Sequence, residues 1–345
     1  MSRRWRNFFF LFGVAAIIVM LFTLDSTVSE IGEIVRTAGG KLLLLILLWV
    51  PIYLMNALAW YLIIRDDCRS GVPFMQVFKM SVTGFALNYV TPFGLMGGEP
   101  YRIMELTPYV GAAKASSSVI LYVMMHICSH FCFWLSAIAV YVTLHFCVGG
   151  MYVLNWWTGF VLAVLTIVFL LVCWLFSRGF RHGFVVKVFG LLGRLPLVRR
   201  WAVPFLDSHS EQLQRIDGQI RHLHGEGHGK PFWGSLLLEY SARVLGCVEY
   251  WILLRLLVPD ATFLDSFVIS AFSSCFSNML FIMPMQLGAR EGGLALAAAS
   301  ISLPGSVGLS VSLMTRIREF VWIVIGVGIM KLGNKVKSDD KGSAS

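Results

Sequence analysis

Residues 91–100 read TPFGLMGGEP and interrupt an otherwise apolar part of the chain. Proline lacks the amide hydrogen that a continuing helix needs, and glycine exposes the backbone, so a helix that reaches this stretch should end near Val90. A new helix can start at Pro100, because proline suits the first helical position. The stretch therefore predicts two helices separated by a break, with the carboxylate of Glu99 placed beside it.

The composition of the whole chain is that of a membrane protein. Of its 345 residues, 57% are hydrophobic and 14% are charged, and the mean hydropathy is +0.74. Soluble domains carry about 25% charged residues, and a helix needs ~20 apolar residues to cross a bilayer. The predicted spans are residues 8–24, 42–64, 116–146, 155–177, 231–257 and 307–330. Two further apolar regions, 74–110 and 262–302, contain breaks.

Charged loops give the predicted topology. Basic residues precede the first span, dominate residues 178–230 and follow the last span, so both termini should face the cytoplasm. The net charge of +9 comes from basic residues that cluster in the predicted cytoplasmic loops, so it does not indicate a nucleic-acid partner. The prediction is a single transmembrane domain, 1–337, followed by a disordered polar tail, 338–345. Within it lie a first repeat at about 42–146, an amphipathic cytoplasmic connector at about 178–230 and a second repeat at about 231–332.

A second break resembles the first. Residues 278–293 read NMLFIMPMQLGAREGG, and Pro284 precedes Glu291 by seven positions, as Pro92 precedes Glu99. Three predicted spans separate the breaks, so the second should enter from the opposite membrane face. The fold class that follows is an all-α polytopic membrane protein with about six spans and two re-entrant or broken-helix hairpins related as an inverted repeat.

The two breaks predict an anion site. Irregular backbone cannot face lipid, so each break should line a polar cavity. Each helix that starts there carries about half a positive charge at its N-terminus. Arg102 and Arg290 add two positive charges, and Glu99 and Glu291 subtract two. Protonation of a glutamate would strengthen anion binding, which makes Glu99 or Glu291 a candidate proton switch; alternatively, each glutamate only neutralises its neighbouring arginine or caps its helix.

Other ionisable residues fall inside the predicted spans. Arg243 and Arg316 or Arg318 are expected to line the same cavity, because a charge facing lipid costs at least ~2.5 kcal/mol; a structural ion pair is the alternative. His126 and His130 are one helical turn apart, but no acidic residue accompanies them in sequence, so no metal or cofactor is predicted. The sequence lacks the HExxH, GxSxG and GxxxxGK[ST] patterns, so it offers no catalytic residue from these motifs.

Over roughly residues 5–332 the chain resembles the lysylphosphatidylglycerol synthase transmembrane-region family, whose members are flippase-like bacterial and archaeal membrane proteins. The residues that carry the resemblance are Thr91, Pro92, Gly97, Gly98, Glu99 and Pro100 in the first break, and Pro284, Gly288 and Glu291 in the second. The resemblance implies a multi-pass protein of the bacterial inner membrane with inverted repeats, which in some members moves a phospholipid between leaflets. Where the family pattern has a charged pair after the first break, this chain has Tyr122 and His126. The soluble aminoacyl-transferase domain of the synthase members is not found in this sequence, so lipid aminoacylation is not expected of it.

The sequence-based hypothesis is therefore translocation of an anionic lipid through a central cavity, with a membrane phospholipid or a polyprenyl-phosphate-type lipid as the partner. Two alternatives remain open. The protein could be a membrane-embedded transferase that uses Glu99 or Glu291 as a general base, or a non-catalytic accessory subunit that binds lipid or a partner transferase.

Overall fold

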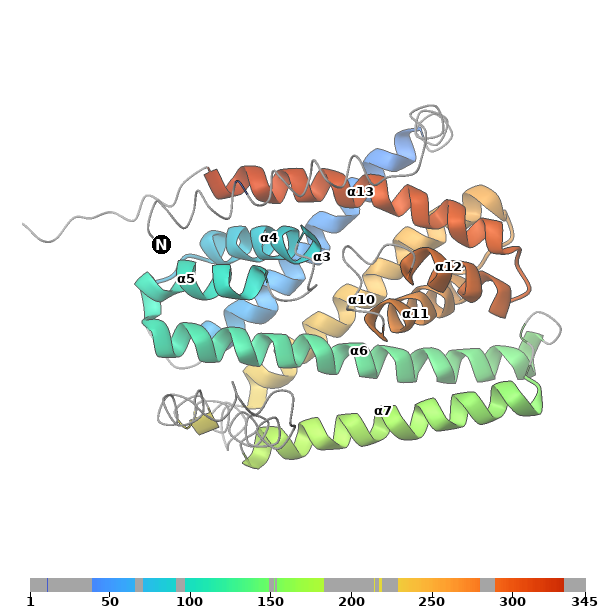
Figure 1. Ribbon diagram of the computed structural model, residues 1–345, viewed down its shortest axis with the longest axis horizontal. Helices are drawn as coiled ribbons and strands as arrows, with labels where there is room; N and C mark the ends of the chain where they lie inside the picture. The colour runs from blue at the N-terminus through green and yellow to red at the C-terminus, as the bar shows by residue number, and fades with distance from the viewer. Residues whose placement is uncertain are drawn as a thin grey trace, which may run out of the picture.

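The computed structural model describes residues 39–65, 71–90, 97–148, 154–182, 229–279 and 289–331 and the single positions 11, 152, 214, 217 and 218. The elements of this part are helices, and it contains no strand, so the all-α class is confirmed (Figure 1). They are α3 (Gly40–Arg65), α4 (Phe74–Val90), α5 (Gly98–Val110), α6 (Ala112–Val148), α7 (Trp156–His182), α10 (Gly229–Leu257), α11 (Phe263–Met279), α12 (Ala289–Ser300) and α13 (Gly305–Lys331).

Three of the described helices, α3, α6 and α7, are long and apolar enough to cross a membrane. The helices α10 and α13 are of similar length, 29 and 27 residues, but each carries charged residues near its middle, which lower its hydropathy. Most of these charged side chains are buried inside the bundle: Glu239, Glu249, Arg316, Arg318 and Glu319. The predicted span 8–24 and most of the connector 178–230 lie outside the described residues, as does the tail 338–345.

Both predicted breaks separate two helices. The first helix ends at Val90, as predicted, but the second begins at Gly98 rather than Pro100. At this start α5 crosses α4 with very little separation. A Cβ atom on Gly98 would lie 2.1 Å from the carbonyl oxygen of Gly84, so only glycine fits. At the second break α11 ends at Met279 and α12 begins at Ala289.

The helices form two series with the same succession of lengths. In the first series α3 is followed by the 17-residue α4, the 13-residue α5 and the long α6. In the second, α10 is followed by the 17-residue α11, the 12-residue α12 and the long α13. The packing is reciprocal: α3 lies against α10, α4 packs on α13 and α11 packs on α6.

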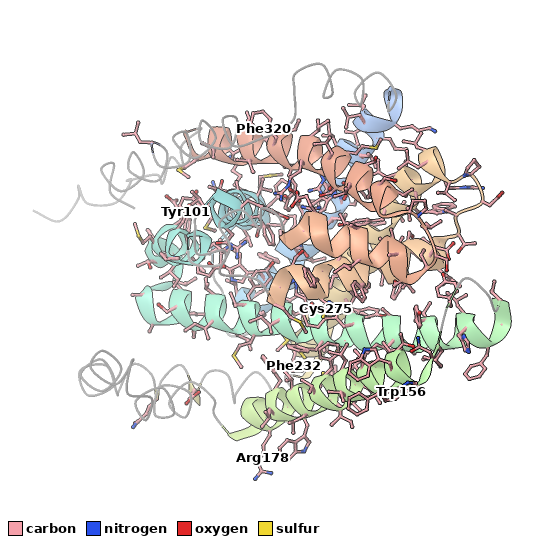
Figure 2. All side chains as sticks on the ribbon, turned by 45° about the vertical axis from the view of Figure 1, so that its right-hand side comes forward. Tyr101, Trp156, Arg178, Phe232, Cys275 and Phe320 are labelled. Carbon is pink, nitrogen blue, oxygen red and sulfur yellow. The ribbon has the colours of Figure 1, made fainter. Side chains whose placement is uncertain are left out.

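The helix α7 lies at the edge of the bundle, alongside α6 (Figure 1). Its outward face is almost entirely apolar and exposed, including Phe160, Ile167 and Leu171. Figure 2 shows Trp156 and Arg178 near its opposite ends. Tryptophan and arginine are typical of the level of the lipid headgroups, so the exposed face between them is suited to contact acyl chains.

The contact between α12 and α13 gives a stability prediction. A Cβ atom on Gly308 would lie 2.2 Å from the carbonyl oxygen of Leu294, a backbone atom that cannot swing away. We expect Gly308→Ala to lower the free energy of unfolding by about 1–3 kcal/mol, as overpacking does, and to lower the melting temperature in detergent. Gly328→Ala on the same helix is the control, because a Cβ atom there meets nothing within 4 Å. Equal melting temperatures for the two variants would contradict the close approach.

Candidate functional site

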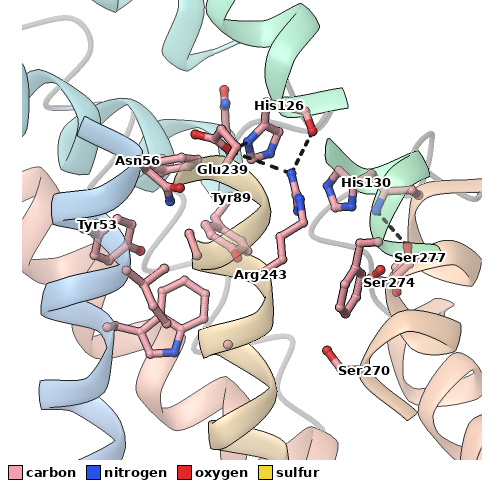
Figure 3. A pocket seen from close by; sticks show the side chains of 18 of the residues that line it. Tyr53, Asn56, Tyr89, His126, His130, Glu239, Arg243, Ser270, Ser274 and Ser277 are labelled. Carbon is pink, nitrogen blue, oxygen red and sulfur yellow. Dashed lines mark hydrogen bonds and ion pairs between the residues drawn. The ribbon is translucent and has the colours of Figure 1, made fainter. Parts of the chain in front are cut away.

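A cavity of about 300 Å³ lies at the centre of the bundle, and Figure 3 shows part of its lining. Every described helix except α7 contributes to its wall. Carboxylate and guanidinium side chains reach it from four helices: Glu99 and Arg102 from α5, Glu239, Arg243 and Glu249 from α10, Arg290 from α12, and Arg318 and Glu319 from α13. The residues that follow the two breaks therefore share one cavity, although the breaks are almost 200 positions apart in the sequence.

The sequence-predicted site residues fall into three groups. Glu99, Arg102, Arg243 and Arg290 line the cavity, and Gly97 and Gly98 are buried at the start of α5. Glu291 and Arg316 are described but are not part of the cavity lining. Thr91, Pro92, Pro284 and Gly288 lie outside the described residues.

The start of α5 is held by a side chain of α4. The Gly98 amide donates to Oδ1 of Asn88 at 2.7 Å, and Nδ2 of Asn88 donates to Oε1 of Glu99 at 2.9 Å. One amide at this helix start is thus already satisfied by the protein itself. The Oε2 atom of Glu99 has no hydrogen-bond partner among the described residues and is buried, although Glu99 lines the cavity.

Arg102 is buried between the carboxylate of Glu99 and aromatic side chains. Its side chain is 1% exposed, and its Nη1 lies 3.5 Å from Oε1 of Glu99. Its guanidinium carbon lies 4.7 Å from the ring centre of Phe85 and 5.3 Å from that of Tyr122. The predicted pairing with Glu99 is present, and the aromatic contacts indicate that Arg102 also braces α5 against α4 and α6.

The second break pairs its charges differently from the expected arrangement. Glu291 bonds to Arg316, with Nη2 3.0 Å from Oε1, and not to its neighbour Arg290. Arg290 pairs with Glu319 and also donates to Oγ1 of Thr315 at 3.1 Å. Adjacent residues on a helix point about 100° apart, so Arg290 and Glu291 face different neighbours, and Glu291 is turned away from the cavity.

Arg318, which the sequence left as an alternative to Arg316, lies in the cavity wall. It binds Glu249 through two hydrogen bonds, Nε to Oε1 at 2.9 Å and Nη2 to Oε2 at 3.0 Å. Both side chains are 1% exposed. Trp49 donates to the same carboxylate at 2.9 Å, and the guanidinium carbon of Arg318 lies 3.8 Å from its ring centre. The Nη1 atom of Arg318 is buried without a hydrogen-bond partner among the described residues.

A second charged group lies where α6 meets α10 (Figure 3). Nδ1 of His126 lies 2.7 Å from Oε2 of Glu239, which is nearer than the Nη2 of Arg243 at 3.9 Å. Arg243 instead donates to Oγ of Ser129 at 2.7 Å and to the carbonyl of His126 at 2.8 Å. Glu239 and Arg243 are one helical turn apart in the sequence. Nothing in the sequence indicated that the nearer partner of Glu239 is His126. Within the described residues, no three potential metal ligands gather here or elsewhere.

The fixed charges of the cavity wall balance. Four arginines and four glutamates line it, so their formal charges cancel when His126 and His130 are neutral. The sequence-based charge count set only Glu99 and Glu291 against Arg102 and Arg290. Glu239, Glu249 and Glu319, which as ionisable residues inside the predicted spans were expected to face the same interior, also line the cavity and remove the excess of positive charge. The helices α5 and α12 begin at Gly98 and Ala289, next to the lining residues Glu99 and Arg290, so their N-termini add positive potential near the cavity wall.

The sequence of this bundle matches a known protein family. The family model described as "Lysylphosphatidylglycerol synthase TM region" matches residues 10–328. No curated protein and no solved structure matches the chain. The match extends over nearly the whole sequence, as the resemblance of the two breaks predicted. The protein is a multi-pass membrane protein, and it belongs to the lysylphosphatidylglycerol synthase transmembrane-region family.

Proposed function

We propose that the protein moves an anionic lipid or a lipid-linked phosphate between the two leaflets of the bacterial cytoplasmic membrane. The headgroup would cross through the central cavity, and the acyl or prenyl tail would remain in the bilayer. The observation that carries the proposal is a cavity of about 300 Å³, with four arginines and four glutamates in its wall, in a bundle that contains helices suited to lipid. A phospholipid or a polyprenyl-phosphate-type lipid is the expected cargo.

The two helix series support a transport mechanism. We infer that α3–α6 and α10–α13 are the two halves of an inverted repeat, because their lengths match and their packing is reciprocal. In transporters built from such repeats, the substrate site lies where the halves meet and opens to one membrane face at a time. The cavity of this protein lies between the halves, with both termini of the domain expected on the cytoplasmic side.

Arg243 is the arginine best placed to receive an anion. Its side chain is 13% exposed, against 1% for Arg102 and Arg318 and 9% for Arg290. Its closest contacts are a hydroxyl and a backbone carbonyl, so its charge is less fully compensated than that of Arg318, which has two hydrogen bonds to one carboxylate. A phosphate that reached the cavity would therefore meet Arg243 with the least loss of existing ion pairs.

The proposal is tested with purified protein in proteoliposomes that contain one labelled lipid, whose access to a membrane-impermeant quencher reports leaflet exchange. We expect the labelled anionic lipids to exchange faster than in protein-free vesicles, and a labelled lipid without phosphate to exchange no faster. Exchange at the protein-free rate for every anionic lipid, with the protein folded and inserted in both orientations, would overturn translocation.

The pH dependence of exchange tests the proton-switch hypothesis. If protonation of Glu99 strengthens anion binding, exchange should become faster as the pH falls, and Glu99→Gln should be fast at every pH. Glu291 is 31% exposed, bonded to Arg316 and outside the cavity lining, so Glu291→Gln should keep the wild-type pH profile. The two variants therefore serve as test and control, and an unchanged profile in Glu99→Gln would remove the switch.

One observation favours an accessory lipid-binding role as a second candidate. The pairs Arg318–Glu249 and Arg290–Glu319 join the helices around the cavity, as in a site built for rigidity. The same proteoliposomes distinguish the two functions, since an accessory subunit binds the lipid without changing the rate of exchange. A transferase, the third reading from the sequence, would instead change the chemical structure of the labelled lipid, which chromatography of the extracted lipids detects.

A further inference from the structure

One face of α11 carries a row of hydroxyl and amide groups. Ser270, Ser273, Ser274, Ser277 and Asn278 all line the cavity, and their spacing of three, one, three and one positions is that of a single helix face. Small residues of this kind also occur where membrane helices pack closely. Here, however, the face is turned toward the cavity, so packing alone does not account for the row.

The hydroxyl of Ser277 lacks the partner that serines in apolar helices usually find in their own backbone. Ser266 and Ser274 on the same helix donate to the carbonyls of Phe263 and Ala271, at 2.6 and 3.2 Å. Ser277 is 4% exposed, and its Oγ has no hydrogen-bond partner among the described residues. A buried hydroxyl without a partner is unfavourable, so its place in the cavity wall points to a ligand that completes it.

Aromatic and amide side chains form the facing wall. Figure 3 shows Tyr53, Asn56 and Tyr89 on the other side of the cavity from Ser270, Ser274 and Ser277. His130 lies beside the serines, and its buried Nδ1 also has no hydrogen-bond partner among the described residues. The cavity thus offers aromatic rings on one side and groups that donate and accept hydrogen bonds on the other.

We propose that the headgroup bound here is a polyol, such as a sugar or an inositol, joined to its lipid through the phosphate. A polyol hydroxyl is both donor and acceptor, and serine, asparagine and neutral histidine side chains match it in both roles. The carbon-bound hydrogens of a polyol ring pack against aromatic faces, and a cavity of about 300 Å³ is at the lower end of small-molecule sites, which suits one ring. Arg243 would bind the linking phosphate. The inference rests on the proposed function for its lipid and adds the chemical class of the headgroup.

Binding tests the headgroup class without requiring transport. Native mass spectrometry of the full-length protein in detergent measures the affinities for dioleoyl phosphatidylinositol and dioleoyl phosphatidylethanol, which share phosphate, charge and acyl chains and differ in the polyol. We expect wild-type protein to bind phosphatidylinositol about tenfold more tightly, and Ser277→Ala to reduce this preference about 3–10-fold, as the loss of one buried hydrogen bond does. Free inositol 1-phosphate as a competitor shows whether the lipid tail is needed for binding. If it competes at equal concentration, polyol recognition is supported, but the ligand of the site is a soluble polyol phosphate and not a lipid.

The matched control is Ser266→Ala, which removes a hydroxyl from the same helix outside the cavity lining and should leave the preference unchanged. Equal affinities of wild-type protein for the two lipids would overturn the inference, and so would an undiminished preference in a Ser277→Ala protein whose melting temperature equals that of the wild type. Translocation is then measured separately on both lipids. Equal binding with exchange of both lipids refutes polyol recognition alone, whereas selective binding without exchange of either refutes translocation alone.

Discussion

Replacing Arg318 with methionine should lower the free energy of unfolding by about 3–5 kcal/mol, the cost of leaving a buried charge without its partner. Glu249 is 1% exposed, and two of its hydrogen bonds come from Arg318. In the variant, only the indole of Trp49 would still donate to this carboxylate among the described residues. Unfolding by sodium dodecyl sulfate in mixed micelles, followed by circular dichroism, measures the change.

The double variant Arg318→Met/Glu249→Leu separates a lost charge partner from lost packing. Replacing both members of a buried pair with apolar residues is often neutral, so the double variant should regain most of the lost stability. Arg255→Met is the control on an exposed arginine, and its effect should stay below about 1 kcal/mol. If the double variant is no more stable than Arg318→Met, the ion pair is not the source of the loss.

Replacing Arg243 with alanine should reduce lipid exchange in proteoliposomes about 10–150-fold, the range that corresponds to a charge-assisted hydrogen bond of about 1.5–3 kcal/mol. Arg243 is the most exposed arginine of the cavity, and its ion pair with Glu239 is long, with 3.9 Å between Nη2 and Oε2. Arg243→Lys keeps the charge but loses the planar fork, so it should retain part of the activity.

Arg255→Ala controls for the removal of a positive charge from the same helix. Arg255 is exposed near the end of α10, where it donates to the carbonyl of Pro259 at 3.1 Å, and it does not line the cavity. Its exchange rate should equal that of the wild type. A folded Arg243→Ala protein with wild-type exchange would exclude this arginine from the headgroup path.

The helices and their breaks could be predicted from the sequence because each depends on local properties. A run of apolar residues sets the length of a helix, and proline and glycine near Val90 end it whatever lies nearby. The predicted start at Pro100 was two residues late. The close packing of Gly98 against Gly84 of α4 is a contact between helices that no local pattern records. The matching spacing of the breaks led to the prediction of one shared site, and residues that follow each break, Glu99 and Arg290, do line the same cavity.

The pairing of charges could not be predicted, because it depends on how each helix is rotated about its axis. Arg316 and Arg318 are two positions apart, so their side chains point about 200° apart and only one can face the cavity. The sequence left Arg316 and Arg318 as alternatives. In the structure Arg318 faces the cavity, and Arg316 forms an ion pair with Glu291. The serine row on α11 was visible in the spacing of residues 270–278, but serine in an apolar helix is also an ordinary packing residue.

The position of α7 determines where the sequence is free to change. This helix packs chiefly against α6 and supplies none of the described cavity wall. Its outer surface therefore needs only to be apolar and long enough to cross the bilayer. Exchanges among leucine, valine, isoleucine and phenylalanine at Ile167 or Leu171 should accumulate without penalty in a library selected for activity. Substitutions of similar size at Ser277 or Arg318 should instead be lost from the same library. The positions that do not tolerate substitution would then identify the cavity side of the molecule from sequence data alone.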